Sequence, residues 1–154
     1  MPRRVLQFTA KHVALAIVVL PAAAITAASG VVLAAGVLGD TAAPVTSGRV
    51  VEALSGATAH LALTTLISAA VGALARQTLT AVVVLLGYLF IVGPLLRDHV
   101  SAAKYLPDSA GIAMWFPPAD DAGAVTPVHG ALLLTAWTVV LIAVAVLGYR
   151  RWDM

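Results

Sequence analysis

The sequence predicts an all-α integral membrane protein, a bundle of four transmembrane helices with a helical or re-entrant outer loop. Of its 154 residues, 61% are apolar and only 10% are charged, whereas a soluble domain carries roughly 25% charged residues. The mean hydropathy is +1.00. Four separate stretches reach the length of about 20 apolar residues that a helix needs to cross the hydrocarbon core of a bilayer.

The four predicted spans form one membrane domain over residues 1–154, and none of them contains Asp, Glu, Lys or Arg. Their limits are residues 13–38, 53–75, 77–96 and 128–149. The outer loop, residues 97–127, joins the third span to the fourth. Thr126 and Pro127 have the residue types of an N-cap and a first helical position, so they predict a defined start for the fourth helix.

The distribution of basic residues predicts the orientation of the bundle. One side carries six of them, namely Arg3, Arg4, Lys11, Arg76, Arg150 and Arg151. The other side carries three, namely Arg49, Arg97 and Lys104. Because cytoplasmic loops are enriched in Lys and Arg, we expect both termini in the cytoplasm. The abundance of Ala, Val and Gly, with two lysines and no asparagine, indicates a GC-rich coding sequence and a bacterial plasma membrane.

The first span has an alternative interpretation as a secretory signal peptide. It begins with basic residues, continues with an apolar run, and contains Ala22-Ala23-Ala24, which resembles a cleavage site. The apolar run extends to Leu38, well beyond the core of a signal peptide. This length favours a retained transmembrane helix.

The outer loop contains apolar and aromatic residues that a plain linker would not need. Residues 100–105 predict a short helix that ends at Pro107. Ile112, Met114, Trp115 and Phe116 follow as an apolar cluster. Aromatic residues beside a span favour the membrane interface, so the cluster is either an interfacial anchor or part of a re-entrant cap over a translocation path.

No pattern in the chain supports catalysis, a metal site or a cofactor. There is no cysteine and no phosphate-binding glycine-rich loop, so we expect no ATP hydrolysis by this chain itself. No histidines have metal-ligand spacing, and no serine has an accompanying His and Asp. The basic residues are scattered rather than clustered, which argues against nucleic-acid binding.

Small and polar residues recur every four positions along the second span. Gly56, His60, Thr64, Ser68 and Gly72 form this ridge, which winds slowly around the helix. One interpretation is a packing seam, because small residues allow close approach of helices. The other is the polar lining of a substrate path. His60 is the one acidic or basic side chain well inside a predicted span, which makes it a functional candidate.

Four motifs, in this order along nearly the whole chain, carry a resemblance to a known family. They are Pro2-Arg3-Arg4-Val5-Leu6 with Ala10-Lys11, Gly72-Ala73-Leu74-Ala75-Arg76-Gln77-Thr78, Tyr105-Leu106-Pro107 with Ala110, and Thr126-Pro127 with Gly130, Arg150-Arg151 and Asp153. Together they resemble the permease subunits of type 2 ABC exporters, especially those of actinobacteria.

The resemblance implies a permease without its own ATPase, paired with a second permease half and served by separate ATP-binding subunits on the cytoplasmic side. It places Arg76, Gln77 and Thr78 near those subunits. Family members usually have six spans, and this chain starts after the second. We therefore expect upstream sequence or a separate chain to supply two helices, and we expect no transport by this chain alone. The alternative function is a small, non-transporting assembly protein that packs with other helices.

Overall fold

A computed structural model describes residues 3–39, 46–75, 77–116 and 125–151 of the chain. Within these residues all regular structure is helical, and no strand occurs. The elements are α1 (Arg3–Leu38), α2 (Ser47–Ala75), α3 (Thr78–Gly87), the π-helical turn η2 (Tyr88–Val92), α4 (Gly93–His99), the 3₁₀ turn η3 (Ser101–Tyr105), α5 (Pro107–Ala113) and α6 (Pro127–Arg151). The predicted all-α class is confirmed.

Four helical stretches are long and apolar enough to cross a membrane, as the sequence predicts. They are Leu6–Leu38, Ser47–Ala75, Leu79–Arg97 and Pro127–Gly148. No more than 22% of the most apolar window of any of them is buried by the rest of the chain. So much exposed apolar surface is unsuited to water and is what a lipid-facing bundle presents.

The first helix begins at Arg3 rather than at Val13, where the apolar run starts. The limit drawn from hydropathy marks the edge of the hydrocarbon core, whereas a helix continues as long as its residues favour helix. Arginine and lysine are good helix formers, and their long side chains reach interfacial water from a helix end. The membrane therefore sets the length of the apolar segment and not that of the helix.

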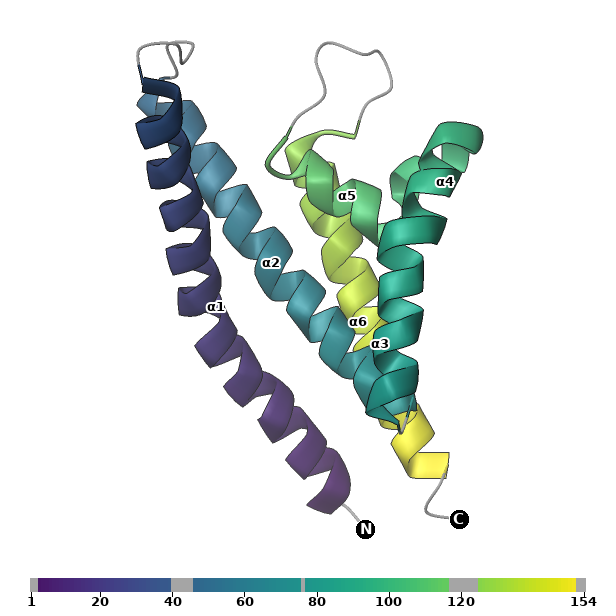
Figure 1. The fold of residues 1–154 in the computed structure, drawn as a ribbon. Helices are drawn as coiled ribbons and strands as arrows, with labels where there is room; N and C mark the ends of the chain where they lie inside the picture. The colour runs from purple at the N-terminus through teal and green to yellow at the C-terminus, as the bar shows by residue number, and fades with distance from the viewer. Residues whose placement is uncertain (1–2, 40–45, 76, 117–124, 152–154) are drawn as a thin grey trace.

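Figure 1 shows how the helices are arranged. α1 and α2 run side by side in opposite directions, and α2 also packs against α6. The start of α1 and the end of α6 lie at the same end of the bundle, together with the junction of α2 and α3. Helix α5 lies toward the opposite end, in contact with α2, α4 and α6.

Two small clusters of buried side chains hold the bundle together. Phe8, Ala70 and Ala145 join α1, α2 and α6. Ala70 and Ala145 are completely buried, so the helices approach closely there through small residues, as membrane helices commonly do. The second cluster, which consists of Ile67, Met114 and Leu134, joins α2 and α6 to the residue that follows α5.

The third span contains a π-helical turn just before Pro94. The backbone N–H of Gly93 donates to the carbonyl oxygen of Tyr88, five residues earlier. Proline has no N–H and clashes with the preceding turn of an α-helix, so a π turn is one way for a helix to accommodate it. The π turn changes the face of the helix on which the following residues lie. It begins with Tyr88, which lines the cavity described below.

The described part of the outer loop up to residue 116 is largely helical and is partly inserted into the bundle. The predicted short helix at residues 100–105 is the turn η3, and the indole N–H of Trp137 donates to the Tyr105 carbonyl at 3.1 Å. Met114 is buried after α5, whereas Trp115 and Phe116 are 40% and 67% exposed. The apolar cluster thus divides into an inserted helical part and an exposed aromatic pair.

Candidate functional site

Helix α5 and the residue after it pack against glycines of three other elements, α2, α4 and α6. A β-carbon at Gly56 of α2 would overlap the carbonyl of Met114, and one at Gly130 of α6 would lie 2.5 Å from the Ala110 carbonyl oxygen. A β-carbon at Gly93 of α4 would lie 2.7 Å from the carboxylate of Asp108. At Gly56 and Gly130 the neighbouring atoms belong to the backbone, so only glycine permits the approach there. At Gly93 the neighbouring atom is the end of the Asp108 side chain.

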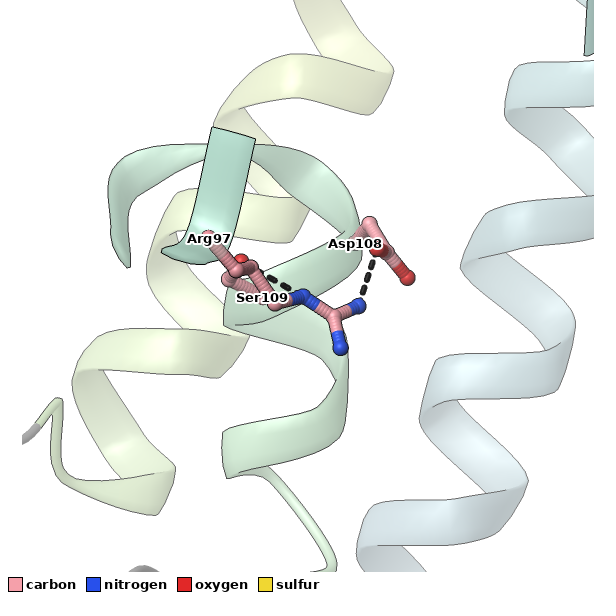
Figure 2. A network of polar contacts seen from close by, with 3 residues as sticks. All are labelled: Arg97, Asp108 and Ser109. Atoms are coloured by element: carbon pink, nitrogen blue, oxygen red, sulfur yellow. Dashed lines mark hydrogen bonds and ion pairs between the residues drawn. The ribbon is translucent and has the colours of Figure 1, made fainter. Parts of the chain in front are cut away.

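A polar contact joins α5 to α4. Figure 2 shows Arg97 reaching from α4 to α5, where its guanidinium forms an ion pair with Asp108. Its Nε–H also donates to the Ser109 hydroxyl at 3.2 Å. The Asp108 side chain is 12% exposed and that of Arg97 is 35% exposed. A carboxylate this shielded from water requires a partner, and Arg97 provides it.

A cavity of about 70 Å³ lies beneath α5, bounded by α2, the third span, α5 and α6. Its polar wall consists of His60, Thr64, Ser68, Tyr88 and Asp108. Its apolar wall consists of Ile67, Leu85, Leu89, Pro107 and Leu134. Since one buried water needs roughly 10–15 Å³ of such space, the cavity can hold a small polar group. Its two walls suit a molecule with a polar end and an apolar end.

Two polar atoms at this cavity have no hydrogen-bond partner among the residues that the structure describes. They are Nδ1 of His60 and the hydroxyl oxygen of Tyr88, and both are buried. Ser68, in contrast, donates its hydroxyl proton to the Thr64 carbonyl at 2.9 Å. Leaving a buried polar group unpaired costs roughly 1–3 kcal/mol. Nδ1 of His60 lies against Gly111 of α5, so the unpaired Tyr88 hydroxyl is the atom that indicates a place for a polar ligand.

The residues of the predicted ridge fall into three different surroundings. His60, Thr64 and Ser68 lie together at the cavity. Gly56 lies against the backbone that follows α5, away from the cavity wall. Gly72 has no atom within 4 Å of where a β-carbon would be, so its side of α2 is open in this chain. Only part of the ridge therefore faces the inserted helix.

The residues expected near an ATP-binding subunit lie at the junction of α2 and α3. Arg76 is outside the described residues. Gln77 is exposed and immediately precedes α3, where its Oε1 accepts a hydrogen bond from the Thr80 hydroxyl at 3.3 Å. Thr78 is the first residue of α3. This junction is at the same end of the bundle as the start of α1 and the end of α6 (Figure 1).

Three functional candidates, Tyr88, Arg97 and Asp108, were not singled out as site residues from the sequence. Tyr88 stands in an apolar run, and the two charged residues belong to the outer loop, where the prediction rested on the apolar and aromatic residues alone. One signal was available: Asp108 directly follows the Tyr-Leu-Pro element of the family resemblance. In the described part of the chain, no group of three or more His, Asp or Glu side chains is placed to hold a metal ion.

Comparison with known proteins adds no assignment. No family model, no curated protein and no solved structure matches the chain.

Proposed function

We propose that this chain is a membrane-spanning permease subunit of an ATP-driven ABC-type exporter and contributes part of the translocation path. The observation that carries the proposal is the cavity beneath α5, where five polar side chains meet inside an otherwise apolar bundle. Polar groups at such positions are costly in lipid and are retained where a substrate or ion passes. Short helices enter a membrane domain where they are buried in protein or line a cavity.

The position of α5 suits a movable closure at one end of the path. The helix is held by close packing and by one ion pair, and the short turn η3 precedes it in the chain. It lies at the end of the bundle opposite the chain termini (Figure 1). On the orientation that the basic residues predict, this is the outer end, so the cavity is closed toward the outside by α5.

The opposite end carries the surface proposed for the ATP-binding subunits. Arg76, Gln77 and Thr78 connect α2 to α3 there, and α2 supplies three of the cavity's polar residues. A force applied at this junction would be transmitted along α2, because a packed helix moves as a unit. The exposed apolar faces of α1 and α3 are available to lipid and to a second permease half.

The test is to purify the chain from its own genomic context, co-expressed with the reading frames on either side. We expect a subunit with a phosphate-binding loop to co-purify, and ATP hydrolysis to depend on that subunit. Gln77→Ala combined with Arg76→Ala should reduce its capture, whereas Arg49→Ala, an exposed arginine near the start of α2, should not. Purification of an assembly that contains this chain but no ATP-binding subunit would contradict the proposal and favour the non-transporting assembly protein.

A further inference from the structure

We infer that the cavity beneath α5 binds the ammonium group of a lipophilic primary amine, with Asp108 as the counter-ion. The inference rests on the proposed function and deepens it, since it names the class of molecule that enters the path. It rests on the hydrogen-bond acceptors of the polar lining residues, on the position of Arg97, and on the apolar residues that line the same cavity.

The polar wall offers acceptors. Asp108 supplies a carboxylate, and Figure 2 shows one of its oxygens meeting Arg97 while the other points toward the side of α2. The Ser68 hydroxyl donates a hydrogen bond to the Thr64 carbonyl oxygen, so the Ser68 oxygen remains available as an acceptor at the cavity. The unpaired Tyr88 oxygen can accept as well, whereas Nδ1 of His60 lies against Gly111.

A primary ammonium matches this set because it has three N–H donors and no acceptor. An anionic group would face the Asp108 carboxylate and is disfavoured by its charge. An alcohol brings one donor, so it would leave most of the acceptors unpaired. A quaternary ammonium brings charge without any N–H. Both the charge and the donors of the ligand therefore contribute to recognition.

Arg97 is the competitor for the same carboxylate. Its guanidinium reaches Asp108 from the partly exposed side, and it also donates to Ser109. An ammonium inside the cavity would share the carboxylate or displace the guanidinium from it. Displacement would remove the ion pair between α4 and α5, so amine binding would loosen the helix that covers the cavity. Removal of Arg97 should accordingly strengthen amine binding.

The apolar residues of the cavity determine the chemistry of the rest of the ligand. Ile67 and Leu134 are buried, whereas Leu89 is 38% exposed. A volume of about 70 Å³ holds an ammonium and the first carbons attached to it, but not a long chain. The rest of the hydrocarbon must therefore extend outside the cavity, and partly exposed apolar residues of the lining, such as Leu89, can contact it. The ligand is therefore an amine with an apolar body.

The experiment measures binding of radiolabelled dodecylamine to the chain in lipid nanodiscs, with protein-free nanodiscs to correct for partitioning. At neutral pH the amine is protonated, since a primary alkylamine has a pKa of about 10.4. We expect saturable binding, with competition that decreases from dodecylamine to dodecyltrimethylammonium to dodecanol. Equal competition by dodecanol would overturn the inference, and so would stronger competition by dodecyl sulfate.

The variants separate a counter-ion from a structural residue. Asp108→Asn should lower the affinity for dodecylamine by about tenfold or more, because it removes a shielded charge partner. Arg97→Gln breaks the same ion pair but should bind the amine as tightly as the wild type or more tightly. Glu52→Gln removes an exposed carboxylate elsewhere on α2 and should leave the affinity unchanged. Equal losses in Asp108→Asn and Arg97→Gln would show that the pair acts only through structure, and would overturn the inference.

Ser68→Ala keeps the inference testable if Asp108→Asn is not recovered as folded protein. It removes one acceptor from the cavity, and unchanged dodecylamine affinity in this variant would count against the site. The two proposals fail separately. Amine binding without an ATP-binding partner would retain this inference and refute the exporter. Capture of the ATP-binding subunit without saturable amine binding would support the exporter and refute this inference.

Discussion

The imidazole ring of His60 lies so close to Gly111 that a β-carbon at position 111 would overlap ring atoms Nδ1 and Cε1. His60 belongs to α2 and Gly111 to α5, so the contact joins a transmembrane helix to the short helix that covers the cavity. The position of α5 and the direction of the imidazole are therefore fixed by each other. A change at either residue should alter both the stability of the bundle and the polar wall of the cavity.

We predict that Gly111→Ala destabilises the protein by about 1–3 kcal/mol, the usual cost of forcing extra atoms into a packed site. The measurement is unfolding by denaturant in mixed micelles. Gly87→Ala is the matched control, because no atom lies within 4 Å of its β-carbon position. Alanine should be neutral or slightly stabilising there, since it favours helix over glycine. Adding His60→Ala to Gly111→Ala should restore part of the lost stability. Equal stability of Gly111→Ala and Gly87→Ala would contradict the overlap.

A second pair of glycines tests which part of the ridge on α2 is a contact. Gly56→Ala should lower the free energy of unfolding, because the methyl group would overlap the Met114 carbonyl. Gly72→Ala should not lower it in the isolated chain, because the space around position 72 is open. Both are helical glycines, so helix propensity contributes equally to the two measurements. If Gly72→Ala were the more damaging variant, the described packing of α5 on α2 would be wrong.

The four spans could be predicted from the sequence because bilayer thickness sets the length of an apolar run. The limits of the helices could not, as the start of α1 at Arg3 illustrates. His60, Thr64 and Ser68 could be grouped because residues four apart share a helix face. Their partner could not be identified, since it is α5, a short helix from the outer loop, rather than another span.

The other half of the candidate site depends on contacts between distant parts of the chain. Arg97 and Asp108 are eleven positions apart in the outer loop, and no local pattern pairs them; only the folded chain brings them together. The π turn that begins at Tyr88 lies just before Pro94, and proline alone does not specify a π turn rather than a kink. Local pattern therefore predicts which residues share a helix face, and tertiary packing decides what they face.

The ion pair between Arg97 and Asp108 is testable by a double-mutant cycle with Arg97→Gln and Asp108→Asn. We expect a coupling of about 0.5–1 kcal/mol in the free energy of unfolding, because Arg97 is partly exposed and solvent weakens the attraction. Arg97→Gln combined with Glu52→Gln is the control pair. Those two residues lie on different elements without a described contact, so their effects should add. Purely additive effects of Arg97→Gln and Asp108→Asn would show that the pair contributes nothing to stability.

The orientation of the bundle is the last prediction, and the absence of cysteine makes it direct to test. With four spans the start of α1 and the end of α6 lie at one end (Figure 1), and the excess of Lys and Arg there predicts that this end is cytoplasmic. Single cysteines at positions 2, 45, 76, 122 and 153 would be treated with a membrane-impermeant thiol reagent in intact cells. Labelling should occur at 45 and 122 and appear at the other three only after the cells are broken.

Labelling of 2 and 153 in intact cells would reverse the orientation and place α5 at the cytoplasmic end. Labelling of 153 without 2 would instead mean an odd number of crossings. In that case the start of α1 and the end of α6, which Figure 1 places at one end of the bundle, could not lie on the same side of the membrane.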